Sequence, residues 1–106
     1  MAFDPALADR VRDALPRHVT EKRMFGGLCF LDRGNMACGI VGDALMLRMG
    51  EAAEAARREP HTRPMDFTGR PMKGMLFVDA EGVADDDRLR AWVGRSLAFT
   101  ATLPAK

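Results

Sequence analysis

Two cysteines and two histidines are the side chains best suited to chemistry in this 106-residue sequence. Cys29 and Cys38 lie on either side of a predicted turn at residues 32–35, and an even register across that turn would place them directly opposite each other. Cysteines paired in this way can form a disulfide or a thiol switch. We favour two reduced, buried thiols, since two cysteines are too few for a secreted disulfide framework. His18 and His61 add too few ligands for a zinc site at any usual spacing.

Two further motifs have a weaker claim to chemistry. Residues 94–98, GRSLA, have the spacing of a nucleophile elbow but fall inside a helical pattern, which favours a structural Ser96. The acidic run at residues 85–87 is explained by N-capping and by the helix dipole without a bound cation. The sequence contains no phosphate loop and no dinucleotide fingerprint. We therefore expect no enzyme activity, no catalytic residue, no cofactor and no metal.

Basic side chains gather in the stretch 57–73, where they form a candidate anion-binding patch. The patch consists of Arg57, Arg58, Arg63, Arg70 and Lys73. An ordinary solvated face is the simpler interpretation, because acidic residues are interspersed and no nucleic-acid recognition motif is present. Small-ligand or nucleic-acid binding at this patch stays open as the alternative function. The formal net charge of +1 provides no global field that would attract polyanions.

The stretch 23–49 has the alternating pattern of an antiparallel strand meander, with turns at residues 32–35 and at Gly42 and Asp43. A two-residue hairpin loop at Gly42 sets the register of the strands on either side. The predicted pairs are Val41 with Ala44, Ile40 with Leu45, Cys38 with Leu47, and Met36 with Met49. One face of the meander is then apolar and forms the core: Cys29, Leu31, Met36, Cys38, Ile40, Leu45, Leu47 and Met49.

The opposite face of the meander is expected to be half-exposed, because it carries smaller residues and ends in a charge. Leu28 joins it from the preceding strand. An apolar face of this kind suits a protein partner or a second copy of the chain, so we expect a protein partner or a homodimer. Direct nucleic-acid contact is less favoured, and we expect no membrane contact. The candidate interface consists of Phe30, Ala37, Val41, Met46 and Arg48.

Three helices are predicted to cover the core face. Asp4 and Pro5 begin the first, residues 51–58 form an alanine-rich connector, and the acidic run begins a third helix that Trp92 anchors to the sheet. A second hairpin is predicted from residues 65–67 and 75–78. The tail from Thr100 is expected to fray. The order is α-β-β-β-β-α-β-β-α, an α+β fold with an antiparallel sheet and helices packed on one face.

Length and composition predict one domain spanning residues 1–106, large enough to bury a core of its own. The first ten residues lack the basic and apolar segments of a signal peptide. No apolar run approaches the roughly 18 residues that a membrane span needs. We therefore expect a cytoplasmic protein.

Two short motifs frame the strand-rich part of the chain. RMFGG precedes the meander and GRPM falls in the second hairpin, ahead of the acidic helix start and the tryptophan helix. In this order the sequence resembles the TfoX/Sxy N-terminal domain. The residues that carry the motifs are Arg23, Met24, Phe25, Gly26, Gly27, Gly69, Arg70, Pro71 and Met72. The resemblance implies a small α+β domain similar to the secretion-chaperone-like fold.

The resemblance also implies a regulatory function. The best-known members of the family regulate natural competence, the uptake of DNA in transformation, and act with the cyclic-AMP receptor protein at competence promoters. Those members carry a second, C-terminal domain, whereas this sequence ends at Lys106, so we expect the stand-alone form. The family supplies no catalytic residues. The resemblance therefore implies a non-enzymatic interaction or regulatory module that works by protein contact.

Overall fold

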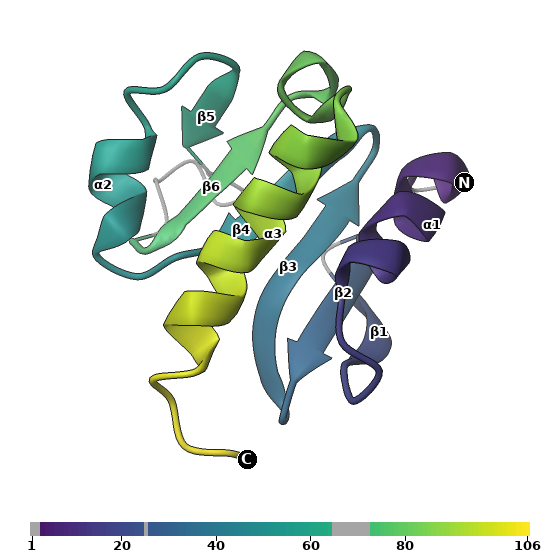
Figure 1. Cartoon of the computed structure of the whole chain (residues 1–106), viewed down its shortest axis with the longest axis vertical. Helices are drawn as coiled ribbons and strands as arrows, with labels where there is room; N and C mark the ends of the chain where they lie inside the picture. The colour runs from purple at the N-terminus through teal and green to yellow at the C-terminus, as the bar shows by residue number, and fades with distance from the viewer. Residues whose placement is uncertain (1–2, 25, 65–72) are drawn as a thin grey trace.

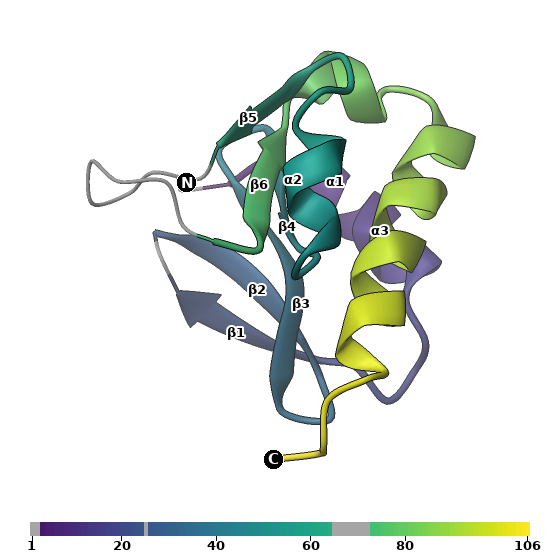
Figure 2. The ribbon, with the colours of Figure 1, turned by 90° about the vertical axis from the view of Figure 1, so that its left-hand side faces the viewer.

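A computed structural model describes residues 3–24, 26–64 and 73–106, and it has the predicted α+β fold. Its antiparallel strands form one six-stranded sheet in the order β1-β2-β3-β4-β6-β5, with the α-helices on one side (Figures 1 and 2). The strands are β1 (Thr20–Met24), β2 (Gly27–Asp32), β3 (Asn35–Val41), β4 (Ala44–Arg48), β5 (Thr62–Pro64) and β6 (Met75–Val78). The helices are α1 (Pro5–Ala14), α2 (Ala52–Ala56), the 3-10 turn η1 (Ala80–Val83) and α3 (Asp86–Thr100).

Both long helices begin where the sequence predicts. The Asp4 side chain accepts a hydrogen bond from the backbone N–H of Ala6, and Pro5 opens α1. Asp85 caps α3 in the same way through the N–H of Arg88. The helix α2 is shorter than the predicted residues 51–58. Its alanine face still packs on the core, as its buried side chains show: Ala53 and Ala56.

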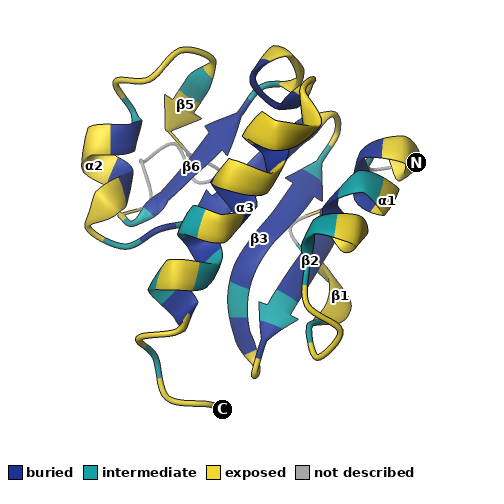
Figure 3. Cartoon of the chain, viewed as in Figure 1, coloured by how far each residue is buried: buried dark blue, intermediate teal, exposed yellow. Residues whose placement is uncertain are grey.

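The main hydrophobic core lies between the sheet and the helices. Trp92 is 7% exposed and packs within this core, which confirms its predicted role as the anchor of α3. Figure 3 shows the buried side of α3 against the strands and its exposed side facing outward. From the sheet, the core receives Leu28, Phe30, Cys38, Ile40, Leu45, Leu47, Leu76 and Val78.

The β3–β4 hairpin has the predicted register near its turn. Gly42 has a φ of 61°, as a primed hairpin loop requires, and Val41 pairs with Ala44. The next predicted pairs also form, and the ladder ends at Cys38 and Leu47. The predicted pairing of Met36 with Met49 is wrong: Met49 belongs to the main core, whereas Met36 packs on the other face of the sheet.

A β-bulge explains why the predicted faces fail beyond that point. The turn keeps the expected register at Leu31 and Met36, but Phe30 then pairs with Cys38, which leaves Ala37 as the extra residue. Because successive side chains of a strand alternate between the two faces, the extra residue in β3 moves the paired residues of β2 beyond the bulge to the opposite face from the one predicted. Leu28 and Phe30 therefore face the helices, and Cys29, predicted for the core, faces away from them.

A second apolar cluster lies on the sheet face away from the helices. We call it the outer cluster, and its buried members are Cys29, Ala44, Met46, Met75 and Phe77. The sheet is strongly twisted, as the different directions of β1 and β6 in Figure 2 show. The expected half-exposed face is thus largely buried. Of the candidate interface, Phe30, Ala37 and Met46 are buried, and Val41 and Arg48 are partly exposed.

The second hairpin has its later strand, β6, at the predicted residues 75–78. β5 pairs with β6 from Thr62 opposite Val78 to Pro64 opposite Leu76, while the predicted strand at residues 65–67 lies outside the described residues. The proline suits this position, because β5 forms an edge of the sheet. Among the described helices, none has the length and apolar character that a membrane crossing requires.

Candidate functional site

The described residues of the RMFGG motif lie at the end of β1, where Arg23 and Met24 belong, and at the start of β2, which Gly27 begins. Gly26 has a φ of 72°, a left-handed conformation that glycine adopts without strain. A Cβ at Gly27 would lie 2.0 Å from the carbonyl oxygen of Ile40, so β2 and β3 approach too closely there for any side chain. Arg23 lies over the ring of Phe3 at 5.9 Å. Phe25 and the GRPM residues at positions 69–72 lie outside the described residues.

Gly27→Ala is expected to destabilise the domain more than Gly26→Ala. The added methyl at residue 27 meets backbone, which cannot move aside cheaply, whereas residue 26 has open space and only the left-handed penalty of about 1 kcal/mol. Urea unfolding of both variants measures the difference. Equal losses would mean that the close approach of β2 to β3 does not constrain residue 27.

The candidate anion patch is partly neutralised by neighbouring carboxylates. Arg57 lies 3.3 Å from Glu54 and also donates to the carbonyl oxygen of Met75 at 3.2 Å. Arg63 contacts Asp79 at 2.6 Å. The other described members are exposed and do not join these pairs: Arg58 and Lys73. Arg70 lies outside the described residues.

The two cysteines are free, buried and on opposite faces of the sheet. The bulge places Cys29 opposite Gly39, so the prediction that it lies directly opposite Cys38 is wrong. Burial raises the pKa of Cys29 and raises that of Cys38 to about 12. Both are therefore protonated at neutral pH, and a thiol is a poor nucleophile.

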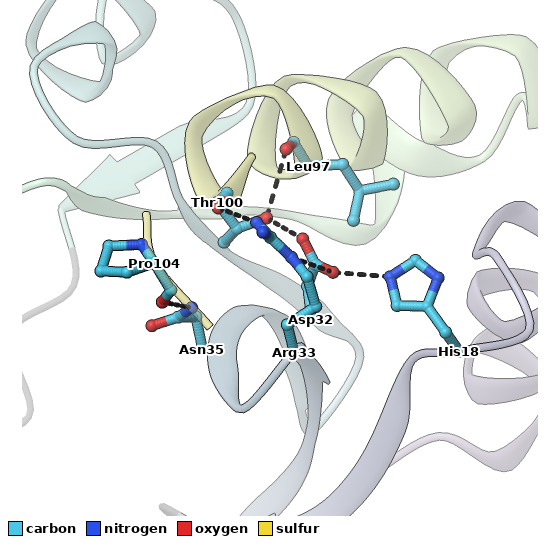
Figure 4. Close-up of polar contacts among 7 residues, drawn as sticks. All are labelled: His18, Asp32, Arg33, Asn35, Leu97, Thr100 and Pro104. Carbon is cyan, nitrogen blue, oxygen red and sulfur yellow. Dashed lines mark hydrogen bonds and ion pairs between the residues drawn. The ribbon is translucent and has the colours of Figure 1, made fainter. Parts of the chain in front are cut away.

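A polar cluster around Asp32 ties the segment between α1 and β1 and the C-terminal tail to the β2–β3 hairpin (Figure 4). The buried Asp32 carboxylate accepts a hydrogen bond from the Thr100 hydroxyl at 2.7 Å and lies 2.6 Å from Nε2 of His18. Asn35 donates to the carbonyl oxygen of Pro104 at 2.9 Å, and the N–H of Lys106 donates to Arg33. The tail is thus held in place, and the prediction that it frays is wrong.

The Asp32 cluster has the residue types of a catalytic triad but not its arrangement. In a triad the histidine lies between the hydroxyl and the carboxylate. Here Thr100 and His18 each contact the carboxylate of Asp32, on different oxygens. Ser96 of the elbow-like motif lies inside α3 and is buried, and its hydroxyl has no hydrogen-bond partner within the described residues. The arrangement around Asp32 and the burial of Ser96 within α3 therefore both suit structural roles.

Acid is expected to weaken the Asp32 anchor. The Thr100 hydroxyl and then His18 lower the pKa of Asp32 below its usual value near 4. A carboxylate whose pKa is depressed on folding stabilises the fold above its unfolded pKa, and this contribution disappears as pH falls through the folded value. Asp32→Asn should therefore be less stable than wild type at pH 7, and the gap should close below about pH 4. Urea unfolding of both proteins from pH 3 to 7 measures this difference in stability. A difference that does not change with pH would contradict a stabilising role of the ionised Asp32 carboxylate.

A cleft opens on the outer side of α3, where the segment after α2 and the turn η1 approach the helix. We call it the tryptophan cleft, and its volume is about 270 Å³. It is lined by Glu59, Pro60, His61, Gly82, Arg88, Ala91, Trp92 and Arg95. Val78 and His61 pack closely against Gly82, where a Cβ would lie 2.6 Å from Cγ1 of Val78 and 2.9 Å from the Cβ of His61. The ring of Trp92 forms an aromatic part of the cleft wall.

The polar groups of the tryptophan cleft are held by specific contacts. Arg95 donates two hydrogen bonds to Glu59, at 3.2 and 2.8 Å, and its guanidinium lies 4.4 Å from the centre of the Trp92 ring. His61 has a φ of 66°, which is unusual for a residue with a side chain, and its Nδ1 lies 3.4 Å from Glu81. Strained backbone of this kind is concentrated at functional sites in proteins.

A second, shallower depression runs between α2 and α3. We call it the α2–α3 groove; its volume is about 460 Å³ and it is lined by Met49, Glu51, Ala52, Arg95, Ala98 and Phe99. Arg95 lines both depressions, so they meet at this side chain. The Phe99 ring packs directly over Gly50, where a Cβ would lie 2.4 Å from the ring. Both depressions therefore involve side chains of α3.

The sequence analysis missed both depressions. The only available signal was the spacing of Arg88, Trp92, Arg95 and Phe99, which places them along one side of a helix. The residues opposite come from α2 and from the loop before β5, and no local pattern relates those segments to α3. None of the candidate interface residues lines either depression, and none of the described anion-patch residues does so.

Comparison with known proteins identifies the family. Neither the curated proteins nor the solved structures include a significant match to this chain. The model of the TfoX N-terminal domain family matches residues 12–100, a range that begins in α1 and ends with the last residue of α3. It therefore covers the sheet, both depressions and the His18, Asp32 and Thr100 contacts, but not the contacts of Pro104 and Lys106. The chain belongs to the TfoX N-terminal domain family.

Proposed function

We propose that this chain is a non-enzymatic regulatory module that binds a partner protein through the α2–α3 groove. The family supports a regulatory or competence-related role in general. The observation that carries the proposal is the groove itself, an open apolar depression between two helices. Grooves of this kind accept an apolar helix or segment of a partner.

The groove has the composition that protein contact requires. Ala52 and Ala98 are small and exposed, so the backbone of a partner can approach closely. Phe99 is partly exposed and offers apolar surface, and Arg95 lines both the groove and the tryptophan cleft. This location replaces the candidate interface from the sequence, because Phe30 is buried in the main core and Met46 is buried in the outer cluster.

A capture experiment with matched variants tests the proposal. Ala98→Glu places a charge in the groove, and Ala6→Glu makes the same change at an exposed position of α1. Wild type and Ala6→Glu should retain the same protein from a lysate of the source cells, with little dependence on salt, and Ala98→Glu should lose it. Sedimentation of the three proteins shows whether a second copy is that partner.

Two results would contradict this function. One is equal capture by wild type and Ala98→Glu, which would exclude the groove as the contact surface. The other is binding of nucleic acid alone, with the steep salt dependence of phosphate contacts, which would favour the alternative function of the arginine-rich second hairpin.

A further inference from the structure

We infer that the tryptophan cleft receives an oxyanion of the partner, a carboxylate or a phosphoryl group, and that Arg88 binds it. This inference deepens the proposed function and rests on it, because Arg95 lines both the cleft and the α2–α3 groove. It assigns to the cleft the recognition of one charged side chain, while the groove supplies apolar contact.

The charges that line the cleft do not balance. Glu59 is engaged by Arg95 through two hydrogen bonds, and Arg95 is also fixed against the Trp92 ring. Arg88 contributes a further positive charge. Its backbone N–H is used by Asp85, but its guanidinium has no hydrogen bond or ion pair in the part of the chain that the structure describes. A guanidinium can bind a carboxylate or a phosphate through two parallel hydrogen bonds.

The nearby acidic residues are already engaged elsewhere or lie outside the cleft. Asp85 caps α3, and Asp86 pairs with Arg10 at 2.9 Å. Neither these two nor Asp87 lines the cleft. Among the described residues, Glu59 is the one acidic side chain in the lining, and Arg95 neutralises it. Glu81 lies outside the lining, 3.4 Å from Nδ1 of His61. An incoming anion therefore meets an unpaired arginine, with no unpaired carboxylate in the described lining.

The cleft also has the size and shape for a single anionic side chain. Its volume of about 270 Å³ holds an oxyanion with part of its carbon chain. Ala91 lines this space with a small side chain, and Trp92 provides an apolar wall for the carbon atoms. His61, in its left-handed conformation, lines the same space. Arg95 is already fixed by Glu59 and the Trp92 ring, so little of its side-chain freedom is lost on binding.

Anion titrations of the protein alone test the inference. Trp92 is the only tryptophan and the chain has no tyrosine, so intrinsic fluorescence reports directly on the cleft. Inorganic phosphate and acetate are added in separate titrations at constant ionic strength. At least one anion should produce a saturable change in wild type, and the stronger of the two shows whether a phosphoryl group or a carboxylate is the better ligand.

Three variants make the titration specific. Arg88→Gln should weaken binding about tenfold or more, as expected when a charge-assisted hydrogen bond is lost. Arg90→Gln is the matched control: it lies about 200° around α3 from Arg88, outside the cleft, and should bind like wild type. Glu59→Gln should tighten binding, because Arg95 loses its bound carboxylate and becomes available to the anion.

The outcomes separate this inference from the proposed function. No saturable signal with either anion, or equal binding by Arg88→Gln and wild type, would overturn the inference. If Ala98→Glu still abolishes capture of the partner in that case, the proposed function stands without it. Loss of both capture and anion binding in Arg88→Gln, with normal behaviour of Arg90→Gln, would support the two together.

Discussion

Replacing Leu47 with glutamate is expected to unfold the domain. Leu47 is fully buried in the main core, between Cys38 and Leu76 on the neighbouring strands. A glutamate there is an unpaired buried charge, which costs several kcal/mol, comparable to the roughly 5–15 kcal/mol that stabilises a whole domain. Loss of the cooperative thermal transition, followed by circular dichroism, is the measurement.

Met46→Glu is also expected to unfold the domain, although Met46 lies on the other face of the sheet from Leu47. Met46 is also fully buried, in the outer cluster, with Gly39 and Phe77 beside it. This overturns the expectation from the sequence, in which Met46 faced a partner and would have tolerated a charge. Lys22→Glu, an exposed position of β1, is the control and should melt like wild type. A cooperatively folded Met46→Glu would show that the outer cluster is not a second core.

The second large effect is expected for Trp92→Ala. The Trp92 side chain packs in the main core, and its removal leaves a cavity that costs about 3–5 kcal/mol. The cation–π contact of Arg95 with the ring is also lost, which adds a smaller amount to the destabilisation. Urea unfolding followed by circular dichroism measures the free energy of unfolding, with Trp92→Phe as the control that keeps most of the apolar contact. A loss below about 1 kcal/mol would mean that the ring contributes little to the core.

Features set by neighbouring residues were predictable from the sequence. The helix starts follow from Asp4 with Pro5 and from the acidic run before α3, which satisfy backbone groups locally. The β3–β4 register follows from the loop at Gly42, whose geometry fixes the pairs beside it. The placement of Trp92 follows from its position in a helical apolar stripe.

Features set by residues far apart in the chain were not predictable. The bulge at Ala37 depends on how two faces of the sheet pack, and it reversed the faces of β2. Asp32 and Thr100 are separated by 68 positions, and no sequence pattern relates them. The tryptophan cleft combines Glu59 and His61 with residues of α3, so it exists only after the helices have packed. The same holds for the α2–α3 groove.

The most direct test of partner binding at the groove is a map of backbone amide chemical shifts. The labelled chain is compared with and without the purified partner captured by wild type. The account predicts the largest shift changes along the groove, at Ala52, Arg95, Ala98 and Phe99, and unchanged shifts in the edge strand β1. Changes confined to β1 or to the β5–β6 hairpin, with α3 unaffected, would contradict it.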